Sequence, residues 1–558
     1  MVRATFSGFN TALSALQANQ KRLDITGQNL SNMNTAGYTR QQLEASSLNY
    51  TNPVSHYSNG NETAVGFGVS MDRVSQIRDP YLDIQYRSQS ADCSYTNRLQ
   101  TALNSLSKVL DETTISGIRQ AFDDIQSTLT SMQDPAKVSD PIYESELRTK
   151  MQSVCNLFNQ ASRQISQAEQ NEFQRLTGEG SSEQGDVQKI NDILRQIGDL
   201  NVQIKRNQVA GHPSLELQDE RNLLLDELSG YIPVETRYYK DDAHSGNNAY
   251  DYDANGAVIG KKDWPDDLEV SMNYIDAQGK SQKLILVNGS DLGADGLTKN
   301  YGQLSVLKGD HQTAASVSDP ANISIKFEKA PSYQGNGQAA ADVYAELKGI
   351  HFEGGSLQAS LDMLQKTGTG NVINGSTAVD DVRGYQYYSG KLDQLASTFA
   401  KSMNDINNKG KNPKDQNLLS NSTNDSTTGI TAGNIGISKG WTSGTIHIST
   451  DGTNRTDTIL DMIAAMKDTK KLNGKTFADY MNNLSTQLAS DSSSNQTALK
   501  TGTTVLNSIQ DSRDSLSGVS LDEEATNMMA YVSAYNAASR LMTALDEVLN
   551  TLISNTGA

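Results

Sequence analysis

Both ends of this 558-residue chain carry apolar residues spaced alternately three and four positions apart. Such spacing places them along one side of an α-helix and is typical of helices that pack lengthwise against a partner. The N-terminal series, which includes one glutamine and one glycine, consists of Phe6, Phe9, Leu13, Leu16, Gln20, Leu23, Gly27 and Leu30. It predicts a helix with one contact face and with too little apolar surface to be stable alone.

The C-terminal helix has a defined start and an unusually wide apolar surface. Ser520-Leu521-Asp522-Glu523 matches a capping box, which predicts that a helix begins near Leu521. Further apolar residues such as Leu541 and Val548 lie off the main line, so the surface is wider than one partner helix needs. An antiparallel pair of terminal helices or an ordinary intramolecular coiled coil would explain the main line, which consists of Met528, Tyr531, Tyr535, Ala538, Met542, Leu545, Leu549 and Leu552.

Between the two ends the pattern is helical, then strand-like, then helical again. The central stretch contains alternating and β-branched runs separated by Asn-Gly and Gln-Gly turns, whereas leucine and isoleucine series of helical spacing flank it on both sides. The sequence therefore predicts a mainly α protein with an inserted β-rich domain (α+β, multidomain), with paired terminal coiled-coil helices and a discontinuous helical bundle. The predicted domains are residues 1–45 with 515–558, residues 46–238 with 355–514, and residues 239–354.

Charge and hydropathy restrict the partners of the chain. Its 47 basic and 65 acidic residues give a net charge of -18, which repels nucleic acid and anionic lipid. No run approaches the roughly 18 consecutive apolar residues of a membrane span. The first 24 residues have a helical period with polar residues interleaved, unlike the continuous apolar core of a secretory signal. We expect no nucleic-acid partner, no membrane insertion and no cleaved signal peptide.

The sequence offers no constellation typical of catalysis or metal binding. Its six histidines are far apart, and Cys93 and Cys155 are interpreted as small core residues, with their pairing left open. The run Asp251–Gly256 matches the first positions of a calcium loop, but Lys262 stands where the bidentate glutamate belongs, so a hairpin turn is the better interpretation. Gly335-Asn336-Gly337 lacks a surrounding βαβ unit and is interpreted as a loop. We expect no enzyme activity, no metal and no cofactor.

The run Asn29-Leu30-Ser31-Asn32-Met33-Asn34-Thr35-Ala36-Gly37-Tyr38 directly follows the first predicted helix. Taken locally it is a helix stop, in which Asn32 or Asn34 takes a left-handed conformation, Gly37 allows positive φ and Tyr38 packs its ring and bonds through its hydroxyl. The run also resembles the N-terminal signature of bacterial flagellar axial proteins, the rod, hook and hook-associated proteins. Ala36 stands where many members have proline, and the following Thr39-Arg40-Gln41 indicates the hook-associated branch.

C-terminal and internal segments resemble the same branch. Residues 517–525 (SGVSLDEEA), 535–540 (YNAASR) and 546–549 (DEVL) are similar to the C-terminal signature of the hook-associated protein 1 family. Residues 190–204, 215–234 and 387–410 are similar to family segments in the expected order, whereas roughly 241–350 has no recognisable match.

The resemblance implies a structural protein that self-assembles at the distal end of the hook, as a junction layer that links the hook to the filament. It further implies export through the flagellar type III apparatus and an extracellular location in the flagellum. The implied partners are other copies of the chain, the hook protein, a second junction protein and an export chaperone.

The assembly contacts are expected in the terminal helices and in the corner between them and the rest of the chain. Alternatives are another axial protein, such as a hook, rod or flagellin-like subunit, and a surface adhesin that acts through the central β domain; flagellins lack the Asn-Thr-x-Gly-Tyr corner. The expected contact residues are Phe6, Phe9, Leu13, Leu16, Leu23, Leu30, Asn34, Thr35, Gly37, Tyr38, Leu521, Met528, Tyr531, Tyr535, Met542, Leu545, Leu549 and Leu552.

Overall fold

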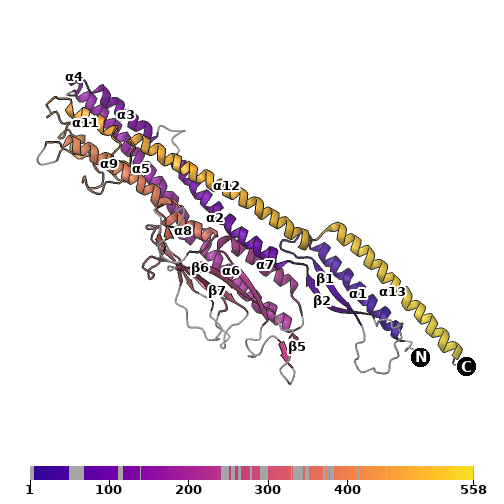
Figure 1. The fold of residues 1–558 in the computed structure, drawn as a ribbon. Coiled ribbons are helices and arrows are strands. Elements are labelled where there is room, and N and C mark those ends of the chain that lie inside the picture. The colour runs from indigo at the N-terminus through magenta and orange to yellow at the C-terminus, as the bar shows by residue number, and fades with distance from the viewer. Residues whose placement is uncertain are drawn as a thin grey trace.

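The computed structural model shows an elongated molecule with both chain termini at the same end (Figure 1). Long helices run along its length, and small sheets lie along one side. The structure describes residues 6–48, 68–110, 117–138, 140–210, 212–240, 250–252, 258–261, 266–276, 279–289, 299–328, 330, 343–345, 351–368, 372–373, 376–377, 382–410, 415–451 and 453–556.

The two terminal helices, α1 (Phe6–Ser31) and α13 (Leu521–Thr556), lie side by side and antiparallel at the end that holds both termini (Figure 1). Gly8 lies against Leu545, whereas the Arg22 guanidinium lies 5.7 Å from the ring centre of Tyr531. Residue numbers therefore increase in opposite directions along the two helices. This confirms the predicted antiparallel pair. The capping box also gave the correct start of α13 at Leu521.

A hairpin that the sequence did not predict packs against α1. Strands β1 (Gln41–Ser47) and β2 (Val69–Gln76) pair antiparallel, with Leu43 opposite Val74 and a bulge between Glu44 and Ala45. We call α1, α13 and this hairpin the terminal arm. The hairpin has few apolar residues and many polar ones on both faces, so the alternation that predicts strands is weak. Strand β1 also crosses residue 45, where the sequence places a domain boundary.

Helices from both halves of the chain form the body of the molecule. Phe122, Phe399 and Phe477 come from three separate helices, and the ring of Phe122 lies 5.1 Å from that of Phe399 and 5.5 Å from that of Phe477. This shared core confirms the mainly α fold with a helical body built from segments on both sides of the β-rich insertion. The helices between the terminal ones are α2 (Pro80–Leu110), α3 (Ile118–Ser131), α4 (Pro135–Val138), α5 (Pro141–Thr177), α6 (Asp186–Val209), α7 (Leu215–Tyr231), α8 (Ser356–Gln365), α9 (Tyr385–Asn407), α10 (Lys439–Ser443), α11 (Asp457–Met466) and α12 (Phe477–Ser517).

Helix α12 runs from the body to the terminal arm alongside α2 (Figure 1). The contact between these two helices is rich in polar side chains: Gln100 donates to the Ser492 hydroxyl at 2.8 Å, and Asn495 donates to the Thr96 carbonyl at 2.9 Å. Gly502 faces Cys93 so closely that a Cβ there would lie 3.1 Å from the sulfur. The connection to the arm is therefore a narrow pair of helices held by hydrogen bonds as well as by packing.

The central segment is rich in antiparallel strands, as predicted, and its first strand begins at Glu235, slightly before the expected residue 239. The side chain of Asn201 on α6 donates to the carbonyls of Leu268 and Gly289, which ties one of these sheets to the helical body. Within the described residues of this segment the strands form three sheets, in the orders β3-β6-β7, β10-β9-β8 and β4-β5. They are β3 (Glu235–Lys240), β4 (Tyr250–Tyr252), β5 (Val258–Lys261), β6 (Asp266–Ile275), β7 (Ser281–Asn288), β8 (Gln303–Lys308), β9 (Ile323–Glu328) and β10 (Val343–Ala345).

Two small hairpins complete the fold, β11 (Val372–Ile373) with β12 (Ser376–Thr377) and β13 (Leu419–Asn421) with β14 (Ile435–Ile437). Both cysteines are buried and unpaired, as expected of small core residues, and burial raises the pKa of Cys155 to about 12. Asp251 lies in β4, but the turn after it, Lys262 and Gly335–Gly337 fall outside the described residues. The described part of the chain contains no group of three histidines, cysteines or carboxylates placed for a metal, and no helix suited to crossing a membrane.

Candidate functional site

The corner after α1 is organised by the buried side chain of Asn29. Its amide nitrogen donates to the Gln41 carbonyl at 3.0 Å, and its oxygen accepts from the Gln41 amide at 3.0 Å and from the Tyr38 hydroxyl at 2.9 Å. Burial, with the negative charge of Asp219 nearby, raises the pKa of Tyr38 to about 12, so its hydroxyl keeps the proton that it donates. One side chain thus fixes the end of α1, the turn and the start of β1.

Gly37 makes the turn itself. Its φ of 78° lies in the left-handed region, and a Cβ there would be 3.4 Å from the Cβ of Leu223. The prediction of a positive φ at Gly37 is confirmed, and so is the bonded role of the Tyr38 hydroxyl. The left-handed conformation proposed for Asn32 or Asn34 is wrong: Asn32 instead donates from its side chain to the Gln28 carbonyl within the last turn of α1.

Thr39, the next residue along the chain, attaches the corner to the body. Its amide and hydroxyl both donate to the carboxylate of Asp219 on α7, at 3.1 and 2.6 Å. Arg78 reaches the same carboxylate at 3.9 Å. Burial raises the pKa of Asp219 to about 6, although the Thr39 hydrogen bonds and Arg78 oppose this rise.

Beyond Asp219 a row of alternating charges continues into the body. Arg78 is paired with Asp83 on α2, and Arg513 on α12 bridges Asp83 at 3.0 Å and Asp226 on α7 at 2.7 Å. Burial alone would raise the pKa of Asp83, but the hydrogen bond and charge of Arg78 bring it below its usual value. Arg87 on α2 is the last residue of the row and forms an ion pair with Asp226 at 2.8 Å. We call these residues, with Asp219, the charged joint.

A second set of ion pairs joins the corner to the start of α13. The Arg40 guanidinium contacts Glu523 and Glu524, both at 2.7 Å, and Glu524 is only 2% exposed. The Arg40 amide also donates to the Ser517 carbonyl at the end of α12, at 2.9 Å. Residues from both ends of the chain therefore meet at one place, between the arm and the body.

The contact face of α13 follows the predicted line. Ala538 is buried and most of the other members of that line are half-buried; Tyr535 and Leu552 are more exposed. Leu521 also lies exposed at the start of the helix. The apolar residues off that line remain exposed, which agrees with a surface wider than one partner needs. They include Met529, Val532, Leu541, Val548 and Ile553.

On α1 the residues predicted to form the contact face are not the residues that are most buried. Leu13 is 46% exposed, and Phe9, Leu16, Leu23 and Leu30 are only half-buried. Helix α1 lies between α13 and the hairpin. Because its backbone comes close to both, small and polar residues are favoured at the contacts, and a search for apolar spacing does not find them. The most buried positions are Ala12, Ala18, Asn19, Ile25, Thr26 and Asn29. The side chain of Phe6 is outside the described part, and Asn34 and Thr35 are exposed in the turn. A role of the predicted residues in contacts between subunits stays a prediction.

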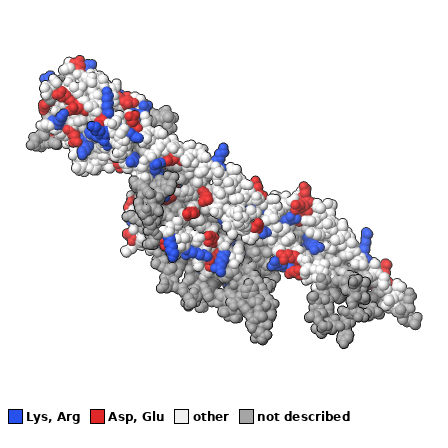
Figure 2. Space-filling model, viewed as in Figure 1, with Lys and Arg blue, Asp and Glu red and all other residues white. Residues whose placement is uncertain are grey.

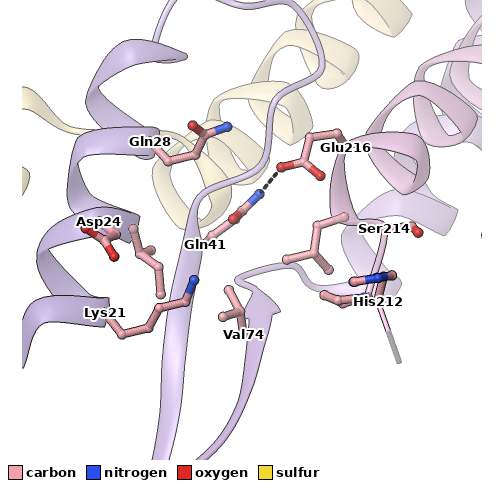
Figure 3. Close-up of a pocket in the computed structure, with 11 residues that line it drawn as sticks. Lys21, Asp24, Gln28, Gln41, Val74, His212, Ser214 and Glu216 are labelled. Atoms are coloured by element: carbon pink, nitrogen blue, oxygen red, sulfur yellow. Dashed lines mark hydrogen bonds between the residues drawn. The ribbon is translucent and has the colours of Figure 1, made fainter. Parts of the chain in front are cut away.

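A cavity of 460 Å³ separates α1 from the start of α7 (Figure 3). Lys21, Asp24 and Gln28 of α1 line one side, and His212, Ser214 and Glu216 line the other side. Gln41 crosses between them and donates to Glu216 at 3.4 Å. The lining mixes both charge signs and forms a polar gap between arm and body.

The visible face of the molecule carries acidic and basic residues interspersed along its length (Figure 2). Charged side chains are neighbours of opposite sign in the body and near the corner on this face. Such a mixed surface favours protein contacts over binding to a polyanion.

Three family descriptions match the chain. They are the flagellar hook-associated protein FlgK helical domain at residues 103–264, the flagella basal body rod protein at residues 9–39, and the C-terminal region of flagellar basal body rod FlgEFG proteins at residues 512–555. Flagellar hook-associated protein 1 of Bacillus subtilis (strain 168) is 28% identical over 568 aligned positions, which cover 99% of each chain. The chain is therefore similar to flagellar hook-associated protein 1 along its whole length. This similarity and the FlgK helical domain support a structural role in the flagellum.

Other hook-associated proteins 1 align over a smaller part of this chain. The protein of Salmonella typhimurium is 29% identical over 40% of this chain and 38% of its own length, and that of Escherichia coli (strain K12) is 28% identical over 40% and 39%. The solved flagellar hook junction protein FlgK of Burkholderia pseudomallei matches 61% of this chain and 46% of its own chain, with 19% identity and a TM-score of 0.39.

The terminal matches at 9–39 and 512–555 coincide with the arm. The sequence located the corner and both terminal helices through their local motifs. It missed Arg78, Asp83, Asp219, Asp226 and Arg513. Arg78 and Asp83 are five positions apart, but the other ion pairs of this set join residues more than a hundred positions apart and leave no local pattern. The only available signal was the unusual density of charged residues in 215–227 beside an apolar helix pattern.

Proposed function

We propose that the chain is a structural subunit of the hook–filament junction, which self-assembles at the distal end of the hook and links it to the filament. Its proposed partners are further copies of the same chain, the hook protein and a second junction protein. Export occurs through the flagellar type III apparatus with the help of a chaperone and without a cleaved signal, and the subunit acts outside the cell. The proposal includes no catalytic step.

The exposed apolar surface of α13 carries this proposal. Leu541 and Val548 are 48% and 59% exposed on a helix whose other face is already packed on α1. Apolar side chains left exposed in a row on a helix favour contact with another protein. Similarity supplies the context, since a relative that aligns along the whole chain, the arm included, carries the name of a hook-associated protein.

The domain division predicted from the sequence fits this role. In this division the arm makes the contacts between subunits of the polymer. The helical body connects the arm to the β-rich segment, which lies farthest from the arm in the order of the chain. Limited proteolysis of the assembled junction tests this division, because the arm should be protected and the β-rich segment should be cleaved first.

Truncation of the arm tests the function itself. Removal of residues 520–558 should leave the hook intact, abolish filament attachment and release filament subunits into the medium, because α1 loses its partner and the polymer loses the α13 surface. The matched control replaces Thr526 and Ser533 by alanine, two exposed positions of α13 that keep the helix. Normal filament attachment by the truncated chain would overturn the proposal.

A further inference from the structure

The arm carries a convex apolar row that faces solvent. Ala537, Leu541, Ala544 and Val548 follow one another at intervals of four, three and four residues along α13, which aligns them on one side of the helix. All four are exposed in the single chain. We call them the outer row.

The arm also carries a concave surface. A groove of 480 Å³ runs between α1 and the hairpin, with Gln20, Lys21 and Asp24 on the helix side and Leu43, Met71 and Val74 on the hairpin side. Met71 is 43% exposed there. Leu13, the most exposed member of the predicted α1 line, lies one helical step before Gln17 of the same groove wall. We call this the arm groove.

The arm groove and α13 lie on opposite sides of α1. Arg22 faces α13 through its contact with Tyr531, whereas Gln20 and Asp24 line the groove. Residues two positions apart on an α-helix point about 200° apart, so the groove side of α1 is turned away from α13. The outer row lies about 60–120° around α13 from the buried Ala538, on the flank of the contact with α1. Each chain therefore presents two different apolar surfaces on its arm.

We infer that the outer row of one copy of this chain docks in the arm groove of the next copy. This inference rests on the proposed function and names the contact through which the subunits join. A contact between two different surfaces is heterologous, and repeating it produces a ring or an open helix instead of a closed dimer. An arm that carries a convex surface and a different, concave one is suited to that kind of growth.

The charges beside the two surfaces favour one direction of the docked helix. Arg540 and Glu547 border the outer row, and Lys21 and Asp24 border the groove; these four exposed residues have no ion-pair partner within the described ranges. Arg73 also lines the groove, but it is paired with Glu44 of the hairpin. When the docked α13 runs antiparallel to α1, Arg540 meets Asp24 and Glu547 meets Lys21. A parallel helix would place like charges together. The antiparallel direction is also that of the chain's own α13, so all copies keep one polarity.

Cross-linking between copies tests the contact. Flagella are isolated from cells whose own gene is replaced by an equal mixture of Leu541→Cys and Met71→Cys copies, and mild oxidation is applied. We expect covalent dimers from the mixture and none from either variant alone; the native Cys93 and Cys155 are buried and do not compete. The control mixture pairs Leu541→Cys with Ser508→Cys, an exposed position on α12.

The outcomes separate this inference from the proposed function. Dimers from Leu541→Cys alone mean that α13 meets α13, and assembled junctions that give no dimers above the control mean that the surfaces do not touch; either result overturns the inference and leaves the proposed function in place. Absence of the wild-type chain from isolated hooks overturns the proposed function, and the docking contact with it.

Charge reversal provides a second, independent measurement. Arg540→Glu should reduce filament attachment at least tenfold, and adding Asp24→Lys in the same chain should restore most of it, because the pair is remade with its signs exchanged. In the double variant Arg540→Glu with Lys21→Glu, filament attachment should stay as low as in Arg540→Glu alone. Equal attachment by the two double variants would contradict the antiparallel pairing.

Discussion

Asn29 should control whether the corner after α1 stays closed. Its side chain is 1% exposed and satisfies three groups at once: the amide and the carbonyl of Gln41 and the hydroxyl of Tyr38. Asn29→Ala leaves these groups without partners, and a buried unsatisfied polar group costs about 1–3 kcal/mol. Because water reaches part of the exposed turn, we expect the corner to lose about 3 kcal/mol in total.

Hydrogen exchange measures this loss locally, which is necessary because a chain with several domains does not unfold in one step. A loss of about 3 kcal/mol accelerates exchange of the Gln41 amide roughly 100-fold, since each 1.4 kcal/mol is tenfold. Tyr38→Phe removes one hydrogen bond and should accelerate it only about fivefold, for a loss of about 1 kcal/mol. Amides in the core of α9 serve as the internal reference and should not change.

Two outcomes would refute this reasoning. Unchanged protection of Gln41 in Asn29→Ala would show that the strand start is held by other contacts. Equal effects of Asn29→Ala and Tyr38→Phe would show that only the tyrosine bond matters. Asn29→Asp gives an intermediate expectation, because it keeps the acceptor for Gln41 and Tyr38 but loses the donor to the Gln41 carbonyl.

Three further predictions concern the same region. Gly37→Ala should destabilise the corner by about 1–2 kcal/mol because of the left-handed φ, and Gly37→Asn should cost less; equal exchange rates in both variants and the wild type would contradict this. Arg40→Ala leaves the buried Glu524 without its cation and should destabilise the first turn of α13 by about 3 kcal/mol, with Arg40→Lys milder; exchange of the α13 amides measures it. The pKa of Asp219 is raised to about 6 in the fold, above an unfolded value of about 3.9, so its stabilising contribution is complete below pH 4 and is lost as pH rises through 6. Protection of the Thr39 amide from hydrogen exchange in the wild type, relative to Asp219→Asn, should therefore rise between pH 6.5 and pH 4, and a pH-independent difference would exclude this role for Asp219.

The features that the sequence predicted are those with a local signal. The three-and-four spacing of α13, its capping box and the glycine of the corner each depend only on residues that are close in the sequence. Each was found in the expected place. The β-rich segment was recognisable because its strands are short and separated by turn residues.

The features that the sequence missed depend on distant partners or on small residues. The buried line of α1 contains Asn19, Thr26 and Asn29, which a search for apolar residues passes over. Asn29 is buried because it bonds to a strand twelve residues away, and no hydropathy scale records that. The charged joint unites α2, α7 and α12, and each of its residues taken alone is indistinguishable from a solvated surface charge.

The contact between Arg40 and Glu524 spans 484 positions of the chain. A ribosome, or any channel that passes the polypeptide from its first residue to its last, therefore delivers one half of the arm at the beginning and the other half at the end. The body can complete its core while the first helix still lacks its partner, so α1 can pair with α13 only after almost the whole polypeptide has been delivered. The time needed to deliver the whole polypeptide sets the earliest moment at which the two ends can close on each other.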